Sequence, residues 1–157
     1  MLMECFYEDG LAFTCLPGCR YCCAVEPGFV FLSMNDLQRL CSFTQKPVKD
    51  FVAEFCIKVP MGSHHYLSLK ERDNHDCIFL GEKGCTVYES RPVQCSTYPF
   101  WAHVLSSGKS WEEEKKWCPG IGKGVLHSKE KIDEQLSLRK ENQPLIFEEL
   151  DMNLILS

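Results

Sequence analysis

Residues 15–23 read Cys15-Leu16-Pro17-Gly18-Cys19-Arg20-Tyr21-Cys22-Cys23, so four thiols lie within nine residues. The Pro-Gly pair favours a turn, and a turn of this kind points several side chains to one side, as a metal site requires. Thiolates suit zinc and iron–sulfur clusters rather than magnesium or calcium. Zinc takes four such ligands, and a four-iron cluster also takes four. The stretch therefore predicts a zinc or iron–sulfur site around which the chain folds.

A disulfide cluster is the alternative reading of these thiols. Adjacent Cys22 and Cys23 would bridge each other only with strain, and the total of eleven cysteines is odd, so at least one thiol would stay unpaired. The N-terminus shows neither the basic nor the apolar region of a secretory signal, which makes the cytoplasm the expected compartment. Thiols stay reduced there, and a cysteine framework is then more often metal-binding or catalytic. The sequence therefore favours metal over disulfides.

A second group of cysteines follows at longer spacings, at Cys77, Cys85, Cys95 and Cys118. The apolar runs that begin at Cys77 and Cys85 flank a Gly-Glu-Lys-Gly turn at 81–84. This is a hairpin pattern, and it predicts that the first two sulfurs of the group lie close together. Cys95 follows a short predicted helical turn, and Cys118 precedes a Pro-Gly pair, a turn of the kind that presents a ligand.

Taken together, these segments resemble a known family. The cluster at 15–23, the run Cys-Ile-Phe-Leu at 77–80, the segment at 85–100 and Trp-Cys-Pro-Gly at 117–120 are similar to the CxxCxxCC cysteine-cluster family, also called the YkgJ-like family, of zinc- or iron-chelating domains. The resemblance covers about residues 13–122, with three residues instead of two in the first cysteine gap. It implies an iron–sulfur cluster or zinc as the cofactor, and eight cysteines as its ligands. These are Cys15, Cys19, Cys22, Cys23, Cys77, Cys85, Cys95 and Cys118.

The same family includes flagellin lysine N-methylases, so the alternative function is that of a metal-dependent enzyme that modifies a protein side chain. Cys15, Cys19 and Cys22 have the gaps of radical S-adenosylmethionine enzymes, but those enzymes place the motif in a barrel larger than a 157-residue chain provides. The glycines at 120, 122 and 124 lack the context of a nucleotide loop and are interpreted as a plain turn. The sequence assigns no catalytic residue. A closed four-ligand site would favour binding, whereas an open metal position would favour catalysis.

The composition is that of a globular chain. Hydrophobic residues make up 45% and charged residues 25%, which excludes a disordered chain. A length of 157 residues predicts a single domain, 1–157, with a cysteine-cluster core at about 13–122. The net charge of −5 argues against nucleic acid as the main partner, because duplex binding needs a basic face. No apolar stretch approaches the length of a membrane span, and a protein partner stays open.

The sequence pattern predicts an α+β fold, a small single domain with short helices and hairpins around a cysteine-rich metal centre. One helix should follow the cap Ser33 and a second should begin at Pro47, with Cys41 and Cys56 on their apolar faces as core residues. Short strands are expected between residues 65 and 87, and residues 100–105 should pair with 111–117. A last helix should follow Ser128 in a C-terminal helical segment at about 128–155, which the proline at 144 interrupts.

Three further expectations concern the site itself. Arg91 matches the family's segment around residue 95, where it would either hydrogen-bond thiolate sulfur or form a surface salt bridge. His75 is the one histidine considered as a ligand, because it precedes the second cysteine group by two residues. Cys22 and Cys23 are expected to divide between two neighbouring metal centres, because adjacent residues of an extended segment point in opposite directions. The two sites would then be interleaved along the sequence.

Overall fold

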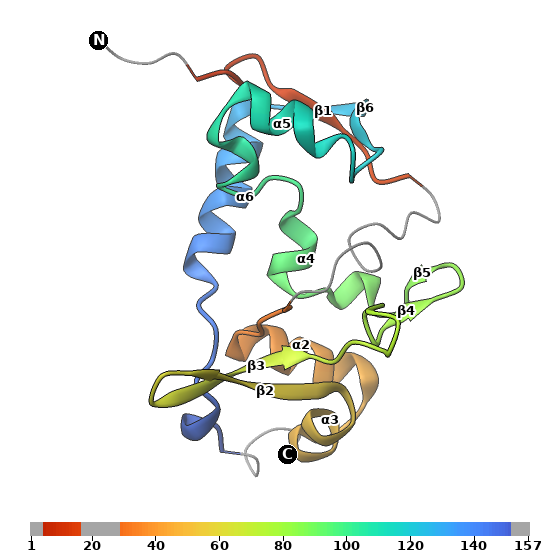
Figure 1. Ribbon diagram of the computed structural model, residues 1–157, viewed down its shortest axis with the longest axis vertical. Helices are drawn as coiled ribbons and strands as arrows, with labels where there is room; N and C mark the ends of the chain where they lie inside the picture. Colours follow the sequence, from red (N-terminus) through yellow and green to blue (C-terminus); the bar gives the residue numbers. More distant parts are fainter. Residues whose placement is uncertain (1–4, 17–28, 152–157) are drawn as a thin grey trace.

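The computed structural model describes residues 5–16 and 29–151, and its buried apolar side chains form two core clusters. Elements of the two clusters lie toward opposite ends of the long axis (Figure 1). Helices and short antiparallel strands make up the described part of the chain, which confirms the predicted α+β class. The strands pair there as β1 with β6, β2 with β3 and β4 with β5. The short helix α4 (Val93–Thr97) lies between the two ends (Figure 1).

The first core cluster packs helices α2 (Met34–Thr44) and α3 (Val48–Phe55) against the hairpin of β2 (Cys56–Met61) and β3 (His64–Leu69). Apolar residues of the helices recur three or four positions apart, so each helix has one apolar face to bury. The hairpin is antiparallel and in register over its full length. The cluster consists of Leu32, Leu37, Leu40, Cys41, Val48, Phe51, Cys56, Leu67, Leu69, Phe79, Val87 and Leu145.

The second core cluster lies among the sheet of β1 (Leu11–Phe13) and β6 (Ile121–His127) and the helices η2 (Val104–Ser106), α5 (Gly108–Glu114) and α6 (Lys129–Glu141). Two of its aromatic rings stack in parallel, with centroids 5.7 Å apart, and this pair joins α5 to the segment that follows α4. The cluster consists of Phe100, Val104, Leu105, Trp111, Cys118, Ile121 and Ile132.

Three predicted helix starts are confirmed. Ser33 accepts the N–H of Asp36 at 3.1 Å, and the Asp36 carboxylate accepts the N–H of Ser33 at 3.0 Å, which completes a capping box at the start of α2. Pro47 precedes α3, and Ser128 caps α6 by accepting the N–H of Lys131 at 3.2 Å. Beyond α6 the chain returns to the first core cluster, where the short helix η3 (Phe147–Glu149) follows. None of the described helices has the length and apolar character needed to cross a bilayer.

Three local expectations are wrong. Residues 100–105 and 111–117 do not pair as strands, because Ser107 accepts the N–H of Ser110 at 3.1 Å and so caps α5. The glycines at 120–124 do not form a plain turn. They lead into β6, in which Gly122 and Gly124 adopt the positive φ angles of 83° and 74°. Cys56 is buried as predicted but does not lie within a helix, since it ends α3 as its C-cap and begins β2.

Candidate metal centre

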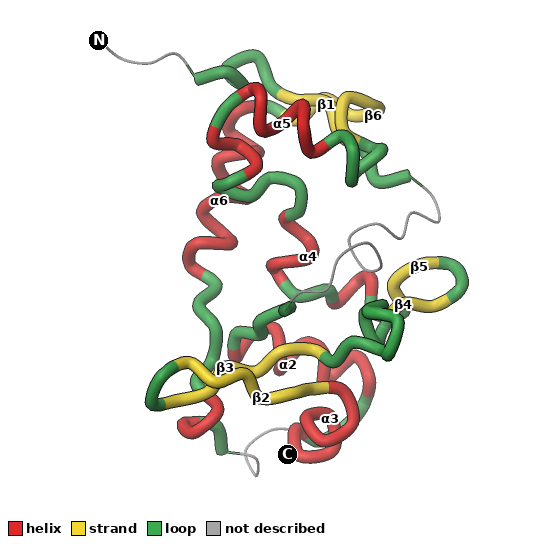
Figure 2. Tube along the Cα trace, in the orientation of Figure 1, coloured by secondary structure: helices red, strands yellow, loops and turns green. Residues whose placement is uncertain are grey.

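Two of the predicted ligands lie on and just before the hairpin of β4 (Leu80–Gly81) and β5 (Gly84–Cys85), at the turn that the sequence predicts (Figure 2): Cys85 ends β5, and Cys77 precedes β4. Leu80 pairs with Cys85, and the Leu80 N–H donates to the carbonyl oxygen of Cys77 at 2.9 Å. The pKa of Cys77 is raised, first by burial and further by the charge of the neighbouring Cys85, although a backbone hydrogen bond with Phe79 opposes the shift. The hairpin therefore brings these two thiols close enough to interact, as predicted.

Cys95 lies in the middle of α4, where its N–H donates to the carbonyl oxygen of Pro92 at 2.9 Å. The next residues along the chain place an aromatic ring against this helix, because Trp101 Nε1 donates to the carbonyl oxygen of Gln94 at 3.0 Å. The guanidinium of Arg139, on α6, lies over that ring with Cζ 4.3 Å from its centroid. Burial lowers the pKa of Arg139, and the charge of the Cys95 thiolate partly offsets the shift. A cation therefore lies near this predicted ligand.

Cys118 is buried in the second core cluster, close to the end of β1 that leads to Cys15. The Thr14 N–H donates to the carbonyl oxygen of Gly120 at 3.3 Å. A Cβ atom at Gly120 would lie only 2.2 Å from the Thr14 carbonyl oxygen, so the absence of a side chain permits this approach. Gly120 thus holds the backbone next to Cys15 beside the turn that follows Cys118.

The remaining predicted ligands, Cys19, Cys22 and Cys23, lie outside the described residues, but both flanks of their segment are anchored. The upstream flank is held at Gly120, as just described. Downstream, the side chain of Gln94 forms two hydrogen bonds with the backbone. Its Nε2 donates to the Phe29 carbonyl oxygen at 2.7 Å, and its Oε1 accepts the Phe31 N–H at 3.2 Å. The described flanks of this segment therefore lie near the turn after Cys118 and beside Gln94, the neighbour of Cys95.

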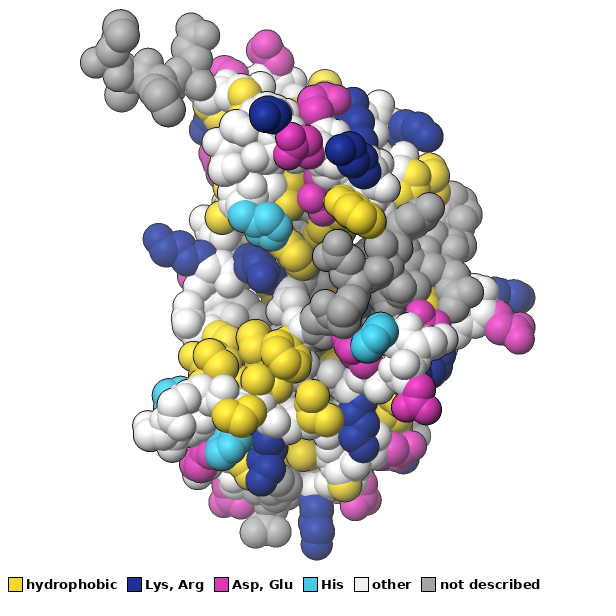
Figure 3. Space-filling model, viewed as in Figure 1, with side chains coloured by type: hydrophobic (Ala, Val, Ile, Leu, Met, Phe, Trp, Pro, Cys, Tyr) yellow, Lys and Arg dark blue, Asp and Glu magenta, His cyan; other side chains and the backbone are white. Residues whose placement is uncertain are grey.

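An aromatic group strengthens the downstream anchor. The rings of Phe29 and Phe31 stack with centroids 5.5 Å apart, and Phe31 meets Tyr66 of β3 edge-on at 5.3 Å. Figure 3 shows hydrophobic side chains gathered in this region of the surface. Phe29 itself is about half exposed, at 52%. The residues that follow position 28 thus pack on β3, at the first core cluster.

Within residues 5–16 and 29–151, no group of three or more His, Cys, Asp or Glu side chains is placed so that it could hold a metal ion. The five predicted ligands in these ranges therefore do not form a complete site by themselves. Their chemistry suits zinc or iron–sulfur, since all five are thiols. A complete site needs further donors, and the assignment of eight cysteine ligands stays a prediction.

The charged residues near the thiols differ in part from the expected ones. Arg91 stacks on Tyr88, with Cζ 3.8 Å from the ring centroid, and its Nε donates to the Tyr88 carbonyl oxygen at 2.9 Å. Instead, the charge of Arg72 lowers the pKa of Cys77, against the larger effect of burial. Neither Arg72 nor the arginine of α6 carries a sequence signal, because their positions depend on packing between distant elements. His75 is exposed and faces Glu71 at 3.4 Å, and no described cluster includes it as a ligand.

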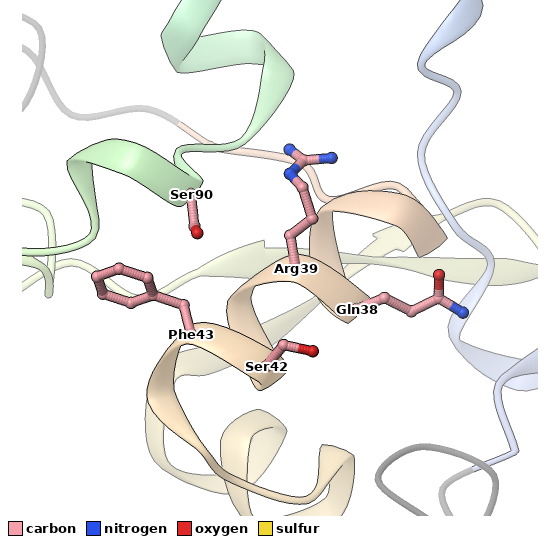
Figure 4. Close-up of a pocket in the computed structure, with 5 residues that line it drawn as sticks. All are labelled: Gln38, Arg39, Ser42, Phe43 and Ser90. Atoms are coloured by element: carbon pink, nitrogen blue, oxygen red, sulfur yellow. The ribbon is translucent and has the colours of Figure 1, made fainter.

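A surface groove of about 460 Å³ lies along α2, apart from the predicted ligands (Figure 4). The Nη2 atom of Arg39 at its edge donates to the Asp36 carboxylate at 2.8 Å and to the Arg91 carbonyl oxygen at 3.1 Å. The lining contains no cysteine, so the groove is not a part of the predicted metal centre. The groove is lined by Gln38, Arg39, Ser42, Phe43 and Ser90.

Comparison with known proteins agrees with the cysteine pattern. Residues 14–119 match the family described as "CxxCxxCC: Putative zinc- or iron-chelating domain". The uncharacterized protein MJ0939 of Methanocaldococcus jannaschii is 29% identical over 150 residues, which cover 92% of this chain and 49% of that protein, so the chain spans about half the length of this curated relative. No solved structure matches significantly. Because the family match extends over most of the chain, the protein belongs to the CxxCxxCC family, whose description supports the binding of zinc or iron.

Proposed function

We propose that the protein is a metal-binding cysteine-cluster protein that holds an iron–sulfur cluster or zinc. Eight thiolates suffice for two sites of four ligands each. Iron–sulfur is the form expected first, because clustered thiolates without a clear histidine partner suit it. The proposed ligands are Cys15, Cys19, Cys22, Cys23, Cys77, Cys85, Cys95 and Cys118.

The hydrogen bonds of the described residues on either side of 17–28 are the observation that carries this proposal. One flank is hydrogen-bonded at Gly120, near Cys118, and the other is hydrogen-bonded to Gln94, next to Cys95. The segment supplies three thiols, and among the described residues the five other proposed ligands do not form a group of three or more that could hold a metal. This arrangement supports sites that combine ligands from both cysteine groups, as the interleaved prediction requires.

The proposed ligands also come from both core clusters. Cys77 and Cys85 pack against the first cluster, and Cys118 belongs to the second. A metal bound by thiols from both core clusters would cross-link the two ends of the molecule. Because such a site does not exist in the unfolded chain, its binding free energy would contribute directly to folding.

Charge supports the same proposal. A zinc ion with four thiolates carries a net charge of −2 by formal count, and such a charge is costly to bury unless it is paired. Arg72 lies near Cys77 and Arg139 lies near Cys95, as their electrostatic effects show. These guanidiniums would offset part of the thiolate charge. When bound, the metal would supply either a rigid structural cross-link or, as a cluster, a group that accepts one electron at a time.

Metal analysis of anaerobically and aerobically purified protein, together with absorption spectra, tests the proposal. Iron with sulfide and a brown colour would support the cluster, and a colourless protein with stoichiometric zinc would support the zinc form. Cys77→Ser, Cys85→Ser and Cys95→Ser should each lose metal, whereas Cys41→Ala and Cys56→Ala, at buried cysteines of the first cluster, serve as controls that retain it. Wild-type protein that is folded as purified but carries no tightly held metal would contradict both forms.

The enzymatic alternative stays a prediction. It depends on an open coordination position, which a closed site of four thiolates would not leave. Metal-loaded protein that binds S-adenosylmethionine would favour this alternative.

A further inference from the structure

Helix α4, which carries Cys95, is capped by a distant part of the chain. The first N–H groups of any helix lack partners within the helix. Pro92 is the N-cap residue of α4, and its side chain makes no capping hydrogen bond. The Val93 N–H donates instead to Oδ1 of Asp36 on α2, at 3.0 Å. The cap of this short helix therefore comes from a residue 57 positions earlier.

The Asp36 carboxylate is fully buried and accepts four hydrogen bonds. Oδ1 accepts from the Val93 N–H at 3.0 Å and from Arg39 Nη2 at 2.8 Å. Oδ2 accepts from the Ser33 N–H at 3.0 Å and from Asn142 Nδ2, just beyond α6, at 2.8 Å. All four partners are donors, and only an ionised carboxylate offers enough acceptor sites on two oxygens to satisfy them.

The geometry points to Asp36 as a positioning residue for Cys95. The placement of Cys95 does not depend on the proposed function, whereas the effect of Asp36 on metal binding rests on it. The Cys95 N–H bonds the carbonyl oxygen of Pro92 at 2.9 Å, so this cysteine belongs to the same turn as Val93. A displacement of the Val93 backbone is therefore passed to Cys95. Metal–sulfur distances tolerate errors of only about 0.2 Å, so the placement of that turn decides whether the thiol can bind.

A second contact, from Trp101, holds α4 independently of Asp36. Trp101 Nε1 donates to the Gln94 carbonyl oxygen at 3.0 Å and lies 3.2 Å from Thr97 Oγ1. The stacked guanidinium of Arg139 covers that ring. Loss of the Asp36 cap should therefore loosen the backbone at Val93 while Trp101 keeps the Thr97 end of α4 attached. This separation makes a local test possible.

The first test uses reduced, metal-free protein, so that it does not depend on metal binding. Asp36→Asn replaces one acceptor oxygen by an NH2 group that faces donors. Leu40→Ala is the control, because it removes buried apolar volume from the same helix without removing a partner of α4. The two variants are compared at urea concentrations that give equal folded fractions, and iodoacetamide labelling is followed by mass spectrometry of the cysteine peptides.

We expect Cys95 to be alkylated at least about tenfold faster in Asp36→Asn than in Leu40→Ala, the factor that corresponds to one lost hydrogen bond to a charged group. The labelling of Cys77 and Cys85 should not differ between the variants by more than about twofold, since neither lies in the α4 turn. Equal labelling of Cys95 in the two variants would overturn the assignment.

The second test adds Co²⁺ to the reduced protein and follows the thiolate-to-cobalt absorption band. Asp36→Asn should weaken Co²⁺ binding by about tenfold or more relative to the wild type, whereas Leu40→Ala, at matched folded fraction, should change it by less than about twofold. Equal weakening by the two variants would mean that Asp36 does not act through the α4 turn that carries Cys95. Wild-type protein that binds no Co²⁺ would contradict the proposed function, and the labelling test would still decide the role of Asp36.

Discussion

The approach of Thr14 to Gly120 gives a sharp test of how the two cysteine groups are held together. In Gly120→Ala, the new Cβ would lie 2.2 Å from the Thr14 carbonyl oxygen, 3.0 Å from its carbonyl carbon and 3.2 Å from Phe13 Cε2. Ordinary contacts of a Cβ begin at 3.4 Å, so the backbone of Thr14 must move by about 1 Å. The obstacle is backbone rather than the end of a flexible side chain, so the strain cannot be relieved by a rotamer change.

Such overpacking costs about 1–3 kcal/mol of stability in well-packed sites. The same displacement moves Cys15, the residue after Thr14, by several times the tolerance of about 0.2 Å for a metal–sulfur distance. We therefore expect Gly120→Ala to lower the free energy of unfolding of the metal-free protein by that amount and to weaken metal binding as well. Urea unfolding and competition with a chelator measure the two effects.

Gly108→Ala is the matched control. The nearest atoms to a Cβ at Gly108 belong to the Phe6 side chain, at 3.6 Å and beyond, which is ordinary contact. Because Gly108 begins α5, alanine should be neutral or stabilising there by up to about 1 kcal/mol. If Gly120→Ala were as stable as Gly108→Ala and held metal as tightly as the wild type, the inferred placement of Cys15 would be refuted.

Three further predictions follow from burial and charge. Phe51→Ala should lower the free energy of unfolding by about 3–5 kcal/mol in urea titrations, since the ring is fully buried in the first core cluster. Burial raises the pKa of Cys41 to about 11 and that of Cys56 to about 12, so these thiols should be the slowest of the described cysteines to alkylate in native protein at pH 8, which labelling with mass spectrometry checks. The hydrogen bond from His65 lowers the pKa of Glu148 from 4.5 to about 2, so its contribution to stability is present above about pH 4.5 and is lost as the pH falls toward 2. Glu148→Gln should remove this part of the acid dependence in thermal unfolding, and an unchanged profile would count against the contact.

Local signals in the sequence predicted several features of the fold. Ser33 and Ser128 cap their helices with side-chain oxygens that act within three residues, and the Gly-Glu-Lys-Gly turn joins the Cys77 and Cys85 arms of a hairpin. These patterns depend on neighbours in the chain, so they can be read without knowledge of the fold. The buried state of Cys41 follows in the same way from its place on an apolar helix face.

Long-range packing explains what the sequence did not reveal. β6 pairs with β1, which lies at the other end of the described chain, and two glycines with positive φ interrupt its apolar pattern. Asp36 completes the capping box of α2 through a local bond, but its bond to Val93 depends on the docking of α4. For the same reason the sequence left two roles open for Arg91, beside a thiolate or in a surface salt bridge, and gave no sign of Arg139 of α6, whose charge interacts with Cys95.

The central claim is that thiols of both cysteine groups hold the same metal centres. X-ray absorption at the iron and zinc edges of anaerobically purified protein tests it most directly when the wild type is compared with Cys22→Ser, from the first group, and Cys95→Ser, from the second. The account predicts a first shell of sulfur alone in the wild type, at about 2.3 Å for zinc, and fewer sulfur ligands or lost metal in both variants. A wild-type shell dominated by nitrogen or oxygen, or a shell that neither variant alters, would contradict it.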